Sequence, residues 1–174
     1  MSDKKPLVIY FSRPDDNYNV GIVKTGNTEL LAKEIIAKTG ADEFKIEPAN
    51  KYPTDYMEAV NLATKELSHQ ARPEYIGDID ISNYDTIFLG YPIWWEDLPM
   101  IVYNFIEKHD WNGKTVIPFN THEGSGNAGT YEILKSKMNG ATLMGDGFNM
   151  TGSTARTDEG IKKLDIWLDT LQEK

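Results

Sequence analysis

The chain contains no cysteine, which excludes disulfide bonds, thiolate metal sites and a cysteine nucleophile. Basic residues are also scarce, since 18 lysines and arginines stand against 27 aspartates and glutamates, and the formal net charge is -9. A surface of this sign repels phosphate backbones and anionic lipids, so we expect neither nucleic acid nor membrane as a partner. No apolar run approaches the length of a membrane span, and residues 1–6 lack the apolar core of a signal peptide. We therefore expect a cytoplasmic protein.

Short apolar runs alternate with helical patterns along the 174 residues, which is typical of βαβ units and a parallel sheet. The expected strands cover 7–11, 42–48, 86–91, 114–120 and 142–149. The expected helices cover 26–38, 56–67, 98–108, 130–138 and a C-terminal segment bearing Ile161, Leu164, Leu168 and Leu171. In the second helix the apolar residues recur at helical spacing and form one stripe, Tyr56, Val60, Ala63 and Leu67. We predict a single α/β domain over residues 1–174, a three-layer sandwich around a five-stranded parallel sheet. The loops after its first, third and fourth strands are expected to meet at one site.

The first of these loops has the features of a phosphate site. Residues 25–28 read Thr-Gly-Asn-Thr and lead into a helix, so hydroxyls, backbone N–H groups and the positive end of the helix dipole surround one point. Gly21 and Gly26 have the spacing of a P-loop, but Asn27 stands where that loop needs lysine, which argues against a nucleoside triphosphate. A hydroxyl-lined monophosphate site and an ordinary helix cap both fit these residues.

The loop after the third strand carries two adjacent tryptophans, Trp94 and Trp95, two residues beyond Pro92. Two neighbouring tryptophans on a loop cannot both point into the core, so we expect at least one to offer its face to a planar ligand. Glu96 and Asp97 suit the first turn of the next helix, which favours negative charge. We expect these two residues to cap that helix rather than to act in catalysis.

The loop after the fourth strand, residues 121–127, gathers hydroxyls, a histidine, a carboxylate and two glycines. Gly124 and Gly126 allow backbone N–H groups to approach a ligand closely. His122 and Ser125 suggest acid–base or nucleophilic catalysis, but the elbow G-x-S-x-G fails because Glu123 stands at its first position. The 3 histidines of the chain do not have the spacing of a metal site. The sequence therefore predicts no catalytic residue and no metal ligand.

Taken in order along nearly the whole chain, these segments resemble the flavodoxin family. The segments are Tyr10-Phe11-Ser12-Arg13, Thr25-Gly26-Asn27-Thr28, Gly90-Tyr91-Pro92-Ile93-Trp94-Trp95, Leu98-Pro99-Met100, and Pro118-Phe119-Asn120-Thr121-His122-Glu123-Gly124-Ser125-Gly126. They are most similar to the short bacterial flavodoxin-like proteins that have a W-W loop and a T-H-E-G-S-G loop. The resemblance implies a flavodoxin-like fold with strand order 2-1-3-4-5 and a non-covalently bound FMN.

The resemblance also implies which residues hold the cofactor. Hydroxyls and helix-start N–H groups that hold the FMN phosphate would come from Ser12, Thr25, Gly26, Asn27 and Thr28. The isoalloxazine ring would be lined on one side by Pro92, Ile93, Trp94 and Trp95. Backbone groups along its other edge would come from Thr121, His122, Glu123, Gly124, Ser125 and Gly126.

One segment departs from the family pattern. The phosphate motif S-x-T-G-N-T is usually contiguous, whereas residues 14–24 here separate Arg13 from Thr25. This insertion is too polar for a core. We interpret it either as a surface excursion that leaves the phosphate site intact, or as a flap in which Tyr18 or Val20 reaches over the flavin.

The resemblance implies an electron carrier that shuttles electrons at low potential between a reductase and an acceptor protein. The acidic surface can serve solubility alone or steer docking onto basic redox partners. The alternative is an NAD(P)H-dependent FMN oxidoreductase of the quinone reductase type. That enzyme needs a nicotinamide pocket, which the W-W loop obstructs, and a basic cluster for a 2′-phosphate, which the sequence does not contain. A third class is a phosphate-binding or receiver domain without flavin. A receiver domain needs acidic residues after the first strand, where Ser12 and Arg13 stand.

Overall fold

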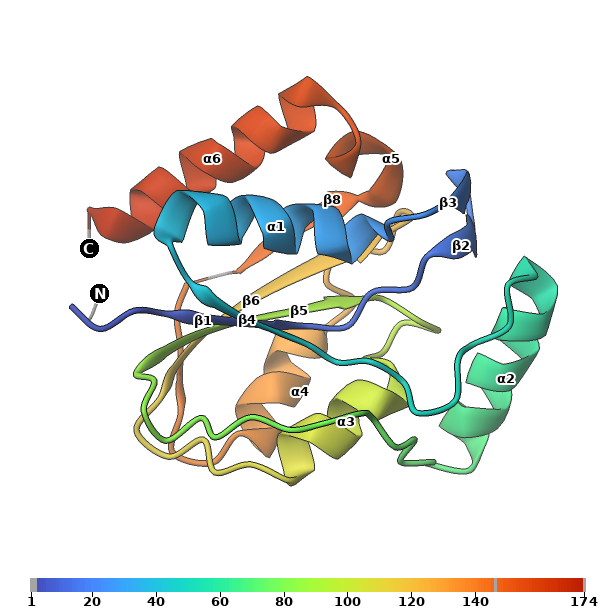
Figure 1. Ribbon diagram of the computed structural model, residues 1–174, viewed down its shortest axis with the longest axis horizontal. Coiled ribbons are helices and arrows are strands. Elements are labelled where there is room, and N and C mark those ends of the chain that lie inside the picture. The colour runs from blue at the N-terminus through green and yellow to red at the C-terminus, as the bar shows by residue number, and fades with distance from the viewer. Residues whose placement is uncertain (1–2, 146, 174) are drawn as a thin grey trace.

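The computed structural model describes residues 3–145 and 147–173, and it places helices on both faces of a parallel sheet (Figure 1). The sheet runs in the order β4 (Asp42–Lys45), β1 (Leu7–Tyr10), β5 (Thr86–Pro92) and β6 (Thr115–His122), and both β7 (Thr142–Leu143) and β8 (Phe148–Thr151) pair with β6. These pairings are all parallel. The expected three-layer α/β architecture with strand order 2-1-3-4-5 is confirmed, with the fifth position shared by two strands.

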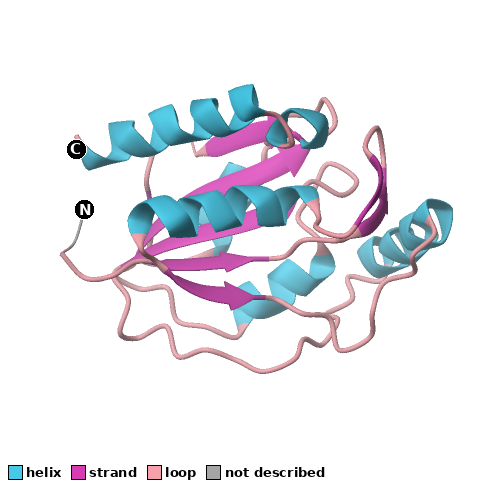
Figure 2. Cartoon of the chain, turned by 45° about the horizontal axis from the view of Figure 1, so that its top comes forward, coloured by secondary structure: helices cyan, strands magenta, loops and turns pink. Residues whose placement is uncertain are grey.

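The helices divide between the two faces and one end of the sheet. One face carries α1 (Asn27–Thr39), α5 (Gly152–Ala155) and α6 (Asp158–Gln172), and the other carries α3 (Met100–Glu107) and α4 (Thr130–Lys137) (Figure 1). Helix α2 (Tyr56–Ser68) stands beyond the carboxyl ends of the strands, beside the hairpin of β2 (Asp15–Asn17) and β3 (Gly21–Val23) (Figure 2). The end of the sheet that α2 approaches is therefore the end where the expected loops meet.

Strand β1 shows why the apolar runs become central strands. Leu7 and Ile9 pack in the core cluster that contains α3 residues, whereas Val8 and Tyr10 pack with α1 and α6 on the opposite face. Side chains of a strand alternate between faces, so a strand with helices on both sides must be apolar at consecutive positions. The continuous apolar run beginning at Leu7 therefore fixes β1 in the middle of the sheet.

The prediction of one continuous fifth strand over 142–149 is wrong. Strand β7 pairs with β6 near Val116, and β8 pairs with it from Phe119 onward, so the two strands follow one another along the same edge. Between them Gly145 and Gly147 have φ values of 64° and 68°, a left-handed conformation that extended strands cannot contain. On β6 the gap between these two pairings includes Pro118, whose carbonyl lies next to Gly147 and which has no N–H to donate to a neighbouring strand. Asp146 lies outside the described residues.

Two further elements were not expected. The polar insertion contains the antiparallel hairpin β2–β3, and the short helix α5 follows β8 directly. Thr151 caps α5, because its side chain accepts a hydrogen bond from the backbone N–H of Thr154. In the part of the chain that the structure describes, none of the helices combines the length and apolar character needed to span a bilayer.

Candidate functional site

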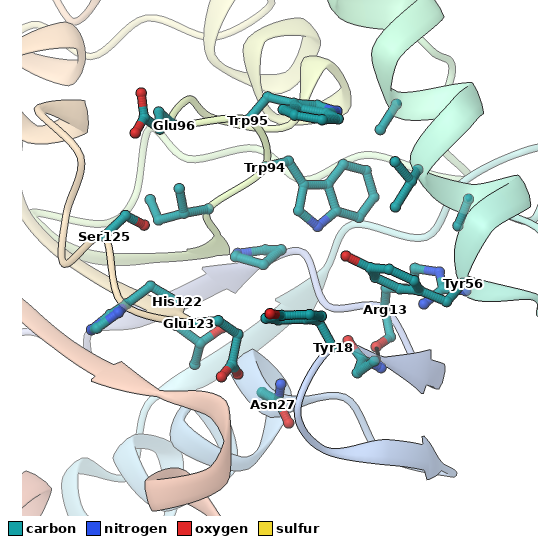
Figure 3. Close-up of a pocket in the computed structure, with 17 residues that line it drawn as sticks. Arg13, Tyr18, Asn27, Tyr56, Trp94, Trp95, Glu96, His122, Glu123 and Ser125 are labelled. Atoms are coloured by element: carbon teal, nitrogen blue, oxygen red, sulfur yellow. Dashed lines mark hydrogen bonds between the residues drawn. The ribbon is translucent and has the colours of Figure 1, made fainter.

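A cavity of about 390 Å³ lies at the carboxyl edge of the sheet, between the loops that follow β1, β5 and β6 (Figure 3). This volume is in the range of small-molecule sites. Its lining comprises Arg13, Asn17, Tyr18, Asn27, Tyr56, Ala59, Val60, Ala63, Pro92, Ile93, Trp94, Trp95, Glu96, Thr121, His122, Glu123 and Ser125. The three loops therefore converge as expected, and helix α2 and the hairpin β2–β3 complete the walls.

The two halves of the expected phosphate motif meet despite the insertion. Gly26 is the N-cap of α1, and the backbone N–H of Glu29 donates to Ser12 Oγ across 3.0 Å. A Cβ at Gly26 would lie 2.3 Å from that oxygen, so only glycine permits this approach without movement. Thr28 Oγ1 lies 2.8 Å from Thr121 Oγ1 and is buried, which ties the helix start to the loop after β6.

Arg13 is the residue that holds the insertion in place. Its guanidinium donates to the carbonyl oxygens of Asp16, of Pro53 at 2.7 Å and of Thr54 at 3.1 Å, and only 7% of the residue is exposed. Burial lowers the pKa of Arg13, and the nearby carboxylates oppose that shift. Asn17 Nδ2 in turn donates to the Arg13 carbonyl at 3.1 Å. The insertion is thus anchored to the first loop and to residues 53–54.

The two tryptophans of the loop after β5 have different environments. The Trp94 ring packs edge-on against Phe11, with centroids 5.3 Å apart, and against Tyr52 at 5.1 Å. Trp95 is 58% exposed and has a φ of 53° in a tight turn that Trp94 and Asp97 close through two backbone hydrogen bonds. Trp94 is therefore a fixed wall of the cavity, and Trp95 stands at its rim, as Figure 3 shows.

The expected capping of the next helix by Glu96 and Asp97 is wrong. Helix α3 begins after Pro99, which is its N-cap and provides no side-chain hydrogen bond. Asp97 Oδ1 instead accepts from the backbone N–H of Leu98 and from the hydroxyl of Tyr103, each at 2.7 Å. Glu96 lines the cavity. Because Pro99 occupies the N-cap position of α3, Glu96 and Asp97 lie too early in the chain to cap that helix.

The loop after β6 is held by its own side chains. His122 Nδ1 accepts from the backbone N–H of Gly124 at 2.9 Å, so Nε2 carries the proton that is shared with Asn149 Oδ1 at 3.1 Å. Glu123 Oε1 accepts from the backbone N–H of Gly152 at 3.1 Å. Both side chains therefore have positioning roles in the loop while they also line the cavity.

The residues expected to contact a cofactor fall into two groups. Asn27, Pro92, Ile93, Trp94, Trp95, Thr121, His122, Glu123 and Ser125 line the cavity. Ser12, Thr25, Gly26, Thr28, Gly124 and Gly126 lie outside its lining. Of the second group, Ser12, Gly26 and Thr28 surround the start of α1, where a phosphate rather than a ring is expected. Gly126 accepts a hydrogen bond from Asn120 Nδ2 through its carbonyl and so shapes the loop.

A family model described as flavodoxin matches residues 6–171 of the chain. The chain belongs to the flavodoxin family. Among solved structures, a protein described as a flavoprotein from Bacteroides eggerthii DSM 20697 is 32% identical, with 98% of this chain and 99% of that one covered and a TM-score of 0.74. A second, from Bacteroides uniformis ATCC 8492, is 29% identical over 95% and 97% of the two chains, with a TM-score of 0.76.

A more distant structure was solved with a ligand. The flavoprotein from Lactobacillus acidophilus NCFM, in complex with FMN, is 18% identical over 93% of this chain and 99% of its own, with a TM-score of 0.63. At that identity the likeness supports the fold alone. No curated protein matches the chain.

Tyr56 and Arg156 were not anticipated as site residues. Tyr56 of α2 stacks on Tyr18 of the hairpin, with ring centroids 6.0 Å apart, and both line the cavity. Of the two expected flap residues, Tyr18 is in the lining and Val20 is not. Arg156, between α5 and α6, donates to Asn27 Oδ1 and to the carbonyl oxygen of Thr25, at the start of α1. The apolar stripe of α2 was the one sequence signal for Tyr56, and it indicated a covered face without identifying what covers it.

Proposed function

We propose that this member of the flavodoxin family binds FMN and carries electrons between a reductase and an acceptor protein. Family membership and the FMN complex of the Lactobacillus acidophilus flavoprotein support the choice of cofactor. When bound, FMN supplies one-electron and two-electron redox chemistry, and the protein sets its access and potential. The residues that line the cavity and those at the start of α1 support this assignment.

The walls of the cavity suit a flavin ring. Among the described residues of α2, only Ala59 is buried, and Tyr56, Val60 and Ala63 of its apolar stripe line the cavity beside it. A helix normally buries such a stripe against protein. A planar apolar ring between α2 and the tryptophan loop would cover it, and the fixed Trp94 would border that ring.

The start of α1 suits the phosphate. The backbone N–H groups of Asn27 and Thr28 stand in the first turn, where a helix provides no carbonyl acceptors for them. Ser12 Oγ accepts from Glu29, so its own hydroxyl proton is available for an anion. The close approach at Gly26 keeps these donors together. This arrangement matches the way helix N-termini bind phosphate groups.

The charges around the cavity favour an electron carrier over an NAD(P)H oxidoreductase. Of the residues that line it, Arg13 is the one arginine or lysine, and its terminal nitrogens are already bonded to three carbonyls. No free cation in this lining is left to hold a nucleotide phosphate. Glu96 and Glu123 line the same cavity, and their negative charge disfavours added electrons, which favours a low potential.

The test is anaerobic reduction of the FMN-loaded protein. We expect retained flavin that dithionite reduces in separate one-electron steps and that NADH and NADPH reduce slowly. A flavodoxin reductase with NADPH should reduce it much faster than the nucleotide alone. Fast nucleotide oxidation with two-electron bleaching would favour the oxidoreductase instead. Failure to retain FMN after its addition and removal of the excess would contradict both.

A further inference from the structure

Arg156 reaches residues 25–28, the proposed phosphate segment, from a turn far along the chain. It lies on the turn between α5 and α6, where Arg156 Nε donates to Asn27 Oδ1 at 3.0 Å and Nη2 donates to the carbonyl oxygen of Thr25. Both acceptors belong to residues 25–28, immediately before and at the start of α1. An arginine thus closes one side of the segment on which the proposed phosphate site depends.

The charge of Arg156 is not paired with a carboxylate within residues 3–145 and 147–173. The other two arginines differ from it: Arg72 forms an ion pair with Glu107, and Arg13 has Asp15 and Asp16 nearby. Burial alone lowers the pKa of Arg156, with no acidic neighbour acting against that shift. Arg156 is exposed, so a bound anion can reach its guanidinium from solvent.

The position of Arg156 strengthens the attraction of the start of α1 for an anion. A guanidinium beside the first turn of α1 adds positive charge to the positive end of the helix dipole. An arginine has five N–H donors, and its bonds to Asn27 and Thr25 use two of them. A phosphate bound at the helix start would neutralise this positive charge and accept hydrogen bonds from the remaining donors.

We propose that Arg156 is a phosphate-binding residue that sets the preference of this protein for FMN over riboflavin. The inference rests on the proposed function, since it assigns a residue to the phosphate end of that cofactor. Hydroxyls and helix N–H groups provide the shape of the site, and Arg156 provides its one full positive charge. Glu123, whose Oε1 accepts a hydrogen bond from the N–H of Gly152, is the one carboxylate of the loop after β6.

The experiment measures FMN and riboflavin affinities by quenching of flavin fluorescence in the apoprotein. The variants are Arg156→Gln, which removes the charge, and Arg156→Lys, which retains it without the forked geometry. Lys163→Gln is the matched control, because it removes an equal charge from an exposed position on α6 that pairs with Glu159. We expect Arg156→Gln to weaken FMN binding by about 10- to 100-fold, the range of lost charge-assisted hydrogen bonds. Riboflavin binding should change less than about threefold, and Arg156→Lys should fall in between.

A second arm separates this inference from the proposed function. Inorganic phosphate should raise the thermal midpoint of the wild-type apoprotein and of Lys163→Gln, and it should not raise that of Arg156→Gln. If the wild type binds no FMN but shows this phosphate effect, the function is wrong and the role of Arg156 stands. Equal losses of FMN and riboflavin affinity in Arg156→Gln, or unchanged FMN affinity, would overturn the inference, since a structural arginine affects both flavins alike.

Discussion

Replacing Gly26 by alanine tests whether the close approach of Ser12 to the helix start builds the phosphate site. Gly26 has φ -67° and ψ 163°, a conformation that alanine adopts freely, so any effect comes from the added methyl group. That group would lie 2.3 Å from Ser12 Oγ and 2.5 Å from the carbonyl oxygen of Arg13, whereas ordinary contact begins near 3.4 Å. The Arg13 carbonyl belongs to the backbone and must retreat by about 0.9 Å.

The cost follows from these contacts. Overpacking of this kind destabilises a protein by about 1–3 kcal/mol. Displacement of Ser12 also breaks its 3.0 Å bond with the N–H of Glu29, which is worth about 1 kcal/mol. We expect Gly26→Ala to lose about 2–4 kcal/mol of the free energy of unfolding, and the thermal midpoint to fall by roughly 4–16 °C at this chain length. FMN affinity should fall about tenfold or more, and riboflavin affinity much less.

The assay combines thermal denaturation of the apoprotein with flavin fluorescence titration. Gly40→Ala is the matched control, because Gly40 ends the same helix with a φ of 70° and open space around it. Alanine there costs about 1 kcal/mol through its left-handed conformation alone. It should therefore lower the thermal midpoint without changing the ratio of FMN to riboflavin affinity. Gly26→Ala with a wild-type midpoint and a wild-type ratio would refute the reasoning.

Three further substitutions test the walls and the charge balance. Tyr18→Ala should speed FMN dissociation by about 2- to 10-fold because it removes the stack on Tyr56, whereas Tyr18→Phe should not; stopped-flow release that is equal in both would contradict a flap. Trp94→Ala should cost about 2 kcal/mol or more in chemical denaturation, since its ring packs on two buried aromatic rings, and an unchanged midpoint would count against a fixed wall. Burial, and then a hydrogen bond with Asp165, raises the pKa of Glu34 above 4.5. The folded protein then holds the Glu34 proton more tightly than the unfolded chain does. It therefore loses stability as the pH rises from the unfolded-state pKa of Glu34 to its folded-state pKa. Glu34→Gln should therefore raise the thermal midpoint at pH 7 and not at pH 4, and an equal gain at both pH values would disprove the assignment.

The layers and the strand order could be predicted because they depend on local patterns. A strand with both faces covered is apolar at consecutive positions, so the run from Leu7 to Tyr10 by itself predicts a central strand. The break in the fifth strand depends instead on two partners far apart in sequence. Pro118 on β6 provides no N–H opposite the turn that contains Gly145 and Gly147. Neither feature alone ends a strand, so a reading of residues 142–149 by themselves gives one continuous strand.

The cavity shows the same division between local and distant information. The loops after β1, β5 and β6 were expected at one edge because parallel strands end together, and all three contribute to the lining. Helix α2 was expected as an ordinary amphipathic helix. Its stripe at Tyr56, Val60 and Ala63 faces the cavity, and periodicity cannot distinguish a face that packs on protein from a face that packs on a ligand.

The phosphate segment shows where motif matching fails on physical grounds. A contiguous S-x-T-G-N-T pattern is short because its residues must surround one phosphate, yet here residues 14–24 intervene and Ser12 still reaches the N–H of Glu29. The hairpin β2–β3 makes this possible, since a hairpin returns the chain to its starting point and Arg13 fixes its base. The spatial motif therefore survives an interruption of the sequence motif. Arg156 reaches Asn27 independently, from the distant turn between α5 and α6. Such a residue can be found only from the structure.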